Sequence, residues 1–152
     1  MRYITFFTVF LLLPLFVGCA EDNPFGVVYV EGTVTYNGDP IEGVSVTFIP
    51  LDAGEQLGAG GRTNSRGRFD LTAGGSPAGS GARPGQYDVI FTKQEVARAA
   101  SPEEEARMRG MGAVTHLIPQ RYNNVRTSGI EPVTVTTNRR NNVFNFALTT
   151  EP

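Results

Sequence analysis

The chain has 152 residues, 18 of them Gly and 10 Pro, with 40% hydrophobic residues, one Cys and one His. This length suits a single domain, and the abundance of Gly and Pro indicates many turns rather than long helices. The formal net charge of −2 argues against nucleic acid as a partner, and one His with one Cys excludes a zinc site built from several such side chains.

Residues 1–18 have the composition of a secretory signal peptide. Arg2 is followed by an uncharged apolar run up to Gly18, which we expect to be helical but shorter than the roughly 20 residues that a membrane span requires. The run ends in Phe16-Val17-Gly18-Cys19, which resembles the lipobox of bacterial lipoproteins, with Phe16 where Leu is common. The resemblance implies cleavage after Gly18, a lipid thioether on Cys19, and acylation of the new amino terminus.

Lipidation would use the only thiol of the chain, so the exported domain would have no disulfide. Residues 19–26 are then a lipidated tether, and Ala20 after the Cys is compatible with the outer membrane, on its periplasmic or surface face. Loss of Arg2 makes the mature chain one unit more negative, which argues against a basic membrane-binding surface. The alternative is an ordinary signal peptide that is cut nearby, which would release a soluble protein with a free Cys.

Residues 27–150 are dominated by a hydrophobic pattern of period two, which indicates strands with one buried face. The residues expected to face the core are Val28, Val30, Val34, Tyr36, Val44, Val46, Phe48, Phe69, Leu71, Tyr87, Val89, Phe91, Val133, Val135, Phe144, Phe146 and Leu148. About seven short strands separated by turns favour an all-β, antiparallel two-sheet sandwich.

Turn residues and one helical signature separate these strands. Asn37-Gly38-Asp39-Pro40 predicts a tight turn, and residues 64–67 predict a hairpin between 60–63 and 68–71. The Gly- and Ser-rich residues 74–81 predict a loop. Within residues 93–112, Ser101 as N-cap, Pro102 and a capping-box Glu predict one short surface helix that ends near Gly110.

Three short motifs follow one another along the chain: residues 30–48, with Asn37-Gly38 and Pro40; residues 62–69, with Thr-Asn…Gly…Phe; and residues 84–89, with Pro-Gly-x-Tyr. In this order they resemble the opening pattern, the second segment and the strand motif of carboxypeptidase regulatory-like domains. The resemblance extends from about residue 30 to 148 and implies a transthyretin-like sandwich in a small bacterial lipoprotein. It implies no particular function, because such sandwiches host many roles.

The sequence offers little for catalysis. His116 is the only imidazole, and nothing near it in the sequence suggests a nucleophile or an orienting group. The Gly-rich segments lack the Lys-Ser/Thr of a phosphate-binding loop, and the carboxylates have no calcium-loop spacing. We therefore expect no enzyme activity, no cofactor and no metal site.

Arg121, Tyr122 and Arg126 form the most distinctive polar segment. An aromatic ring between arginines could contact a glycan or an acidic partner, whereas the interpretation we favour places Tyr122 at the edge of the core. The hypothesis from sequence is thus a non-enzymatic, lipid-anchored module of the cell envelope. It would contact membrane lipid through Cys19 and an envelope protein or glycan through its surface; the alternative is a glycan- or small-ligand-binding protein that uses the Tyr122 segment.

Overall fold

The computed structural model describes residues 23–52, 54, 57–96 and 114–150. The expected signal helix, Cys19 and the expected surface helix near residues 101–110 lie outside these ranges. Residues 23–26, expected to belong to the tether, form a turn in which the Asn23 side-chain amide donates to the Val27 carbonyl at 2.6 Å. The Arg83 guanidinium also donates to the Phe25 carbonyl at 2.9 Å, so this turn is fastened to the domain.

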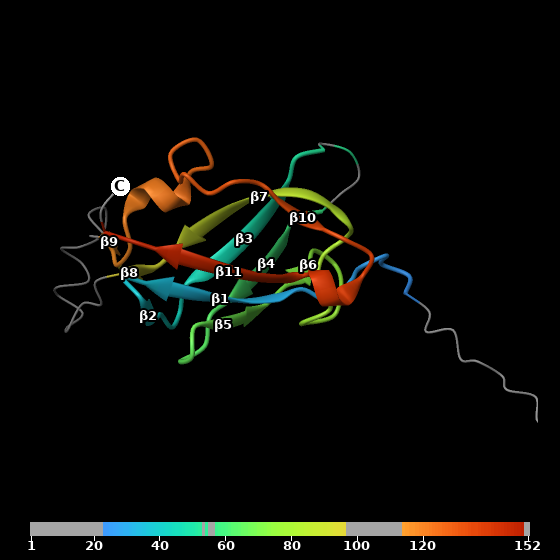
Figure 1. The fold of residues 1–152 in the computed structure, drawn as a ribbon, viewed down its shortest axis with the longest axis horizontal. Coiled ribbons are helices and arrows are strands. Elements are labelled where there is room, and N and C mark those ends of the chain that lie inside the picture. The colour runs from blue at the N-terminus through green and yellow to red at the C-terminus, as the bar shows by residue number, and fades with distance from the viewer. Residues whose placement is uncertain (1–22, 53, 55–56, 97–113, 151–152) are drawn as a thin grey trace, which may run out of the picture.

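The described residues form an all-β fold with two main sheets (Figure 1). The first sheet contains β11 (Val143–Leu148), β1 (Glu31–Tyr36), β2 (Asp39–Pro40) and β5 (Arg68–Asp70). The second has the order β10 (Val133–Val135), β7 (Gly85–Thr92), β3 (Ser45–Pro50), β4 (Ala59–Arg62) and β6 (Thr72–Ala73). A third, two-stranded sheet pairs β8 (Gln94–Val96) with β9 (Val114–His116), and two 3₁₀ turns, η1 (Gln120–Asn123) and η2 (Arg139–Asn141), complete the described fold.

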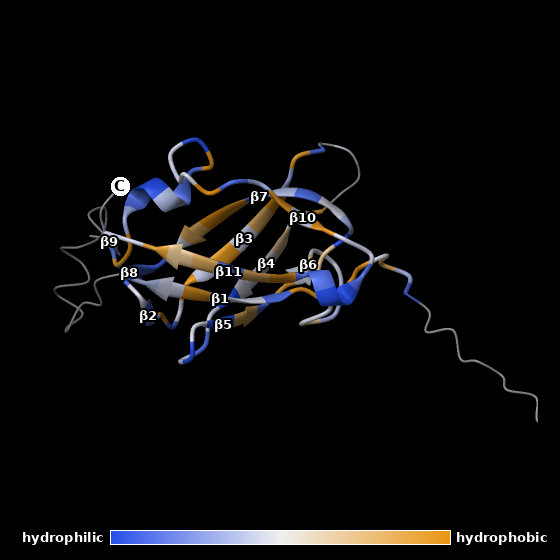
Figure 2. Ribbon diagram, viewed as in Figure 1, coloured by the Kyte–Doolittle hydropathy of each residue, from blue (hydrophilic) through white to orange (hydrophobic). Residues whose placement is uncertain are grey.

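The period-two pattern identified the buried face of each main strand correctly. Val34, Val46, Phe48 and Phe91 have no exposed surface, and their immediate neighbours on the same strands are half-buried or exposed. Figure 2 shows the same division, with hydrophobic residues along β3, β7 and β11 and hydrophilic residues in the turns. Burial of these side chains is the main favourable term in folding, because each removes apolar surface from water.

Aromatic rings from both sheets meet at Phe146 of β11. Its ring centroid lies 4.9 Å from that of Phe91 and 6.4 Å from that of Phe48, both in the second sheet. On its own sheet it stacks on Phe69 and Phe144 at 6.3 and 6.5 Å. The two sheets therefore share one core, and Phe146 lies at its centre.

The turn after β1 has the backbone conformation that the sequence predicted. Asn37 and Gly38 have φ values of 52° and 95°, and Tyr36 pairs with Asp39 across the turn. Two consecutive residues with positive φ are characteristic of the tight hairpin turn that Asn-Gly favours.

Two expectations about strand pairing are met only in part. β1 and β11 are parallel, with Glu31 opposite Val143 and Tyr36 opposite Leu148, so the first sheet is not purely antiparallel. The predicted hairpin of residues 60–63 with 68–71 closes at its turn and continues as the antiparallel pair of β4 with β6, in which Gly60 lies opposite Thr72. Between these two points, β5 pairs with β1 in the other sheet and not with β4. The period of two specifies which face is buried, but not the direction or identity of the neighbouring strand.

Candidate functional site

Arg121 and Tyr122 of η1 fasten the C-terminal end of β11 to the domain. The Tyr122 hydroxyl accepts a hydrogen bond from the Thr149 backbone N–H at 2.9 Å. The Arg121 Nη2 donates to the Thr149 carbonyl at 2.7 Å and its Nη1 to the Thr150 carbonyl at 3.2 Å. These contacts satisfy backbone groups just beyond the last strand of the sheet.

Tyr122 is 4% exposed and belongs to the core cluster, which confirms its interpretation as a residue at the edge of the core. The Arg121 guanidinium lies over its ring, 4.7 Å from the centroid, so the ring presents no open face on which a sugar could stack. Arg126 is exposed on the turn that follows. Arg121 and Tyr122 are thus engaged with each other and with the end of β11, and the ligand contact at Arg121, Tyr122 and Arg126 stays a prediction.

Burial raises the pKa of Tyr122, but the hydrogen bonds from Thr149 and the charge and hydrogen bond of Arg121 together outweigh this effect, so that the net pKa is lowered.

We expect Tyr122→Phe to destabilise the fold by about 1 kcal/mol, because the Thr149 N–H loses its acceptor while the ring still fills its place. Urea unfolding of the two chains measures this. Tyr36→Phe is the control, since that hydroxyl is hydrogen-bonded to the exposed Thr150 hydroxyl, at 3.0 Å; an equal loss in both variants would contradict the assignment.

His116 lies in β9, half-buried and opposite Gln94 of β8. Within the described ranges, no three His, Cys, Asp or Glu side chains lie close enough together to hold a metal ion. The same ranges include no helix of the length and hydrophobicity that a membrane span requires. The expected lipid attachment at Cys19 is outside the described residues.

An open hollow adjoins the turn of residues 23–26, at the start of the described chain. It is an open cleft of about 780 Å³, with Asn23, Phe25, Tyr29, Ser80 and Arg139 among its lining residues. Phe25 is 38% exposed although it is a large apolar side chain. Arg139 is the only charged residue among those that line the cleft in the described chain.

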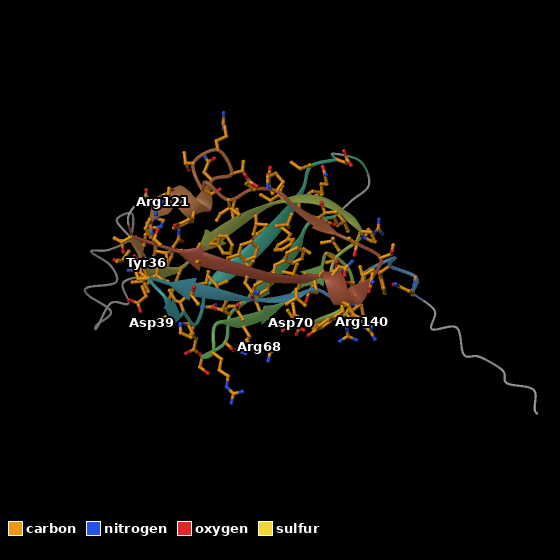
Figure 3. The ribbon with its side chains drawn as sticks, in the orientation of Figure 1. Tyr36, Asp39, Arg68, Asp70, Arg121 and Arg140 are labelled. Carbon is orange, nitrogen blue, oxygen red and sulfur yellow. The ribbon has the colours of Figure 1, made fainter. Side chains whose placement is uncertain are left out.

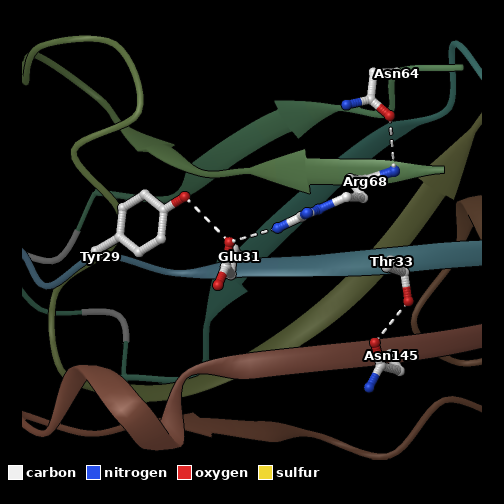
Figure 4. Close-up of polar contacts among 6 residues, drawn as sticks. All are labelled: Tyr29, Glu31, Thr33, Asn64, Arg68 and Asn145. Carbon is white, nitrogen blue, oxygen red and sulfur yellow. Dashed lines mark hydrogen bonds and ion pairs between the residues drawn. The ribbon is translucent and has the colours of Figure 1, made fainter. Parts of the chain in front are cut away.

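Tyr29 connects this cleft to the outer face of the first sheet (Figure 4). The Arg139 guanidinium lies 4.2 Å from the centroid of the Tyr29 ring, a distance typical of a cation–π contact. The Tyr29 hydroxyl donates to Glu31 at 3.3 Å, and Glu31 in turn pairs with Arg68 at 3.2 Å. Desolvation and then the charge of Glu31 raise the pKa of Tyr29, so its hydroxyl remains a proton donor at neutral pH.

A second, smaller hollow of about 210 Å³ follows on the same face, between Glu31, Thr33, Arg68 and Val143. Beyond it, the Thr33 hydroxyl donates to the Asn145 side chain at 2.6 Å across the parallel pair (Figure 4). Several polar side chains on the outer face of the sheet are thus held in place by hydrogen bonds and an ion pair with one another.

The sequence alone did not single out the cleft. Period two places Tyr29 opposite Val28 and Val30, both expected to face the core. Val30 does so, whereas Val28 is half-buried, lies outside the core cluster and lines the cleft. Arg139 follows 110 positions after Tyr29, in the turn before the last strand. The parallel pairing of β1 with β11 brings η2 beside the beginning of β1. Because that pairing was not foreseen, neither was the contact between Tyr29 and Arg139.

Comparison with known proteins gives no family assignment. No protein-family model matches the chain, and no curated protein matches it. Among solved structures, the major pilin subunit of Bacillus cereus, BcpA (D312A variant), is similar with 13% identity and a TM-score of 0.42 over 81% of this chain. A 9R-lipoxygenase from Cyanothece is similar with 11% identity and a TM-score of 0.38 over 85% of this chain. The chain spans only 29% of the pilin and 17% of the lipoxygenase, and likeness at this level says nothing about activity.

Proposed function

We propose that this protein is a lipid-anchored, non-enzymatic module of the cell envelope, which acts by binding or structural support. The observation that carries the proposal is the sequence Phe16-Val17-Gly18-Cys19 after a short apolar run, with Cys19 the only thiol of the chain. Several acyl chains at ~0.8 kcal/mol per buried methylene would hold such a chain stably on a bilayer. Ala20 favours the outer membrane as the site of attachment.

The fold is consistent with a module of this kind. Its core is built from apolar side chains of two sheets and requires no disulfide, which suits an exported chain whose thiol is acylated. The polar atoms of Arg121 and Tyr122 are hydrogen-bonded to backbone groups of Thr149 and Thr150, which fits a structural role for these two side chains.

We further propose that the domain is a carboxypeptidase regulatory-like, transthyretin-like sandwich. Support comes from the motif positions, which have the backbone conformations that such motifs need. Asn37, Gly38 and Gly67 all have positive φ. Tyr87 of the Pro-Gly-x-Tyr segment is fully buried, and its hydroxyl donates to the Arg83 carbonyl at 2.8 Å.

Cys19→Ala is expected to abolish lipid attachment, because the thioether forms at that sulfur. Cells that express the full chain are labelled with radioactive palmitate, and the membrane-bound protein is compared with the variant. We expect label and membrane retention in the wild-type chain only, and a mature amino terminus at an acylated Cys19 by mass spectrometry. Equal labelling of both chains, or a mature terminus elsewhere, would refute the anchor and leave a secreted soluble protein.

A further inference from the structure

The length of chain between Cys19 and the domain determines which end of the fold lies near an anchoring bilayer. The described chain begins at Asn23, whose side chain is hydrogen-bonded to both backbone groups of Val27. Cys19 and Asn23 are four positions apart in the sequence, with three residues between them, and an extended chain across four positions reaches about 14 Å. The end of the fold that carries Asn23 is therefore held close to the lipid headgroups.

The two ends of the domain differ in their side chains (Figure 3). Arg140 lies at the end where the described chain begins, whereas Tyr36, Asp39 and Arg121 lie at the opposite end. β1 runs from the first end to the second, so Tyr36 lies about 17 Å beyond Glu31, at roughly 3.3 Å for each residue of a strand. A probe placed at each end can therefore show which of the two ends contacts the headgroups.

The cleft at the first end has the composition of a surface that meets a lipid interface. Phe25 and Tyr29 supply an apolar and an amphipathic ring, and Tyr is enriched where a protein meets the boundary between lipid and water. Val27 and Pro24 extend the apolar part of the lining.

Arg139 is the group of this cleft that can bind a phosphate, although the carboxylates of Glu31 and Asp70 both act on the neighbouring Tyr29. Arg139 lines it, and the neighbouring Arg140 is exposed. Glu31, the carboxylate that Tyr29 contacts, already pairs with Arg68 in the only ion pair within the described ranges. A guanidinium binds phosphate oxygens with two parallel N–H groups. The mature chain is acidic as a whole, so this complementarity is local and does not arise from net charge.

We propose that the cleft lined by Phe25, Tyr29 and Arg139 docks on the bilayer that carries the chain, with phospholipid headgroups as its ligand. The apolar lining lies against the upper acyl region, and Arg139 with Arg140 binds headgroup phosphate. This inference rests on the proposed anchor at Cys19, because the short tether is what presents this end of the fold to the membrane. Docking would fix the orientation of the domain and leave the β8–β9 end directed away from the bilayer.

The chain has no Trp, so a single introduced Trp reports on one position. Phe25→Trp places the reporter at the cleft, and Val125→Trp is the matched control, since the two native side chains are 38% and 37% exposed. Val125 lies on the turn after η1, which is fastened to Thr149 and Thr150 at the opposite end. Both acylated full-length mature chains are reconstituted on vesicles of phosphatidylglycerol and phosphatidylethanolamine that contain a nitroxide-labelled headgroup lipid.

We expect the nitroxide to quench Phe25→Trp at least threefold more strongly than Val125→Trp, and Arg139→Gln in the Phe25→Trp chain to reduce that quenching by half or more. Equal quenching in the two reporters, on chains that sediment with the vesicles, would overturn the docking and leave the anchor intact. Failure of the chains to sediment with vesicles would overturn both. Inorganic phosphate is also added to the Phe25→Trp chain in detergent, to distinguish free phosphate from lipid headgroups. If phosphate alone shifts the Trp emission as much as vesicles do, the bilayer is not the ligand.

Discussion

Phe146→Ala is expected to lower the free energy of unfolding by about 3–5 kcal/mol, which is the usual loss when a buried Phe is truncated in a core. The Phe146 ring contacts rings from both sheets, including Phe48 and Phe91 of the second sheet and Phe69 of the first. Its removal leaves a cavity between the sheets that neighbouring strands cannot close without breaking their own pairing. A loss of this size is a large part of the total stability of a small domain.

Chemical denaturation with urea measures this effect, and Val143→Thr on the same strand is its control. Val143 is 51% exposed, so replacing it with another β-branched residue removes little buried apolar surface, and a change below about 0.5 kcal/mol is expected for such a surface substitution. If both variants unfold at the same urea concentration as the native chain, the placement of Phe146 in the core is wrong.

The sequence predicted which side chains of each strand are buried, because buried and exposed positions alternate along a strand with a period of two. Val44, Val46 and Phe48, or Tyr87, Val89 and Phe91, are each buried at every second position, and this pattern is visible in a single segment. The Asn37-Gly38 turn was equally predictable, since few other residue pairs accept two consecutive positive φ values. These features depend on neighbours in the sequence.

The pairing of strands could not be predicted in the same way. Residues 64–67 do form a turn, in which Gly67 donates to the Asn64 carbonyl at 2.8 Å and the Asn64 N–H donates to the Arg68 carbonyl at 2.9 Å. After the turn, however, β5 pairs with β1 of the other sheet and not with β4, before β6 pairs with β4 again. Whether a turn joins partners in one sheet or crosses between sheets depends on strands far away in the sequence.

The candidate site was missed for a related reason. The sequence drew attention to Arg121, Tyr122 and Arg126 because they are close together in the chain, but the first two fasten the end of β11. Tyr29 and Arg139 are distant in the sequence and meet only through the β1–β11 pair. Nearness in sequence was therefore a poor guide to which polar residues share a surface.

The close approach of β4 and β5 leads to a second prediction, on how substitutions at two adjacent glycines of β4 change stability. A Cβ on Gly61 would collide with the carbonyl oxygen of Asp70 in β5, a backbone atom that cannot rotate away. A Cβ on Gly60, which points to the other face of the strand, would meet nothing closer than the Val46 carbonyl oxygen at 3.6 Å, an ordinary contact. Gly61 is thus required by the close approach of β4 to β5, and Gly60 is not.

We therefore expect Gly61→Ala to destabilise the domain by about 2–3 kcal/mol, in the upper part of the range for an overpacked core, because β4 and β5 must separate. Gly60→Ala is expected to be neutral or to stabilise the fold by up to about 1 kcal/mol, since it lowers the entropy of the unfolded chain without strain. Thermal and urea unfolding of both variants measure the difference. If β4 and β5 were instead paired as a regular hairpin, neighbouring backbones would be spaced for side chains on both faces and the two alanines would have similar effects. A large loss at residue 61 with none at residue 60 thus supports the passage of the chain from one sheet to the other, on which the arrangement of the core depends.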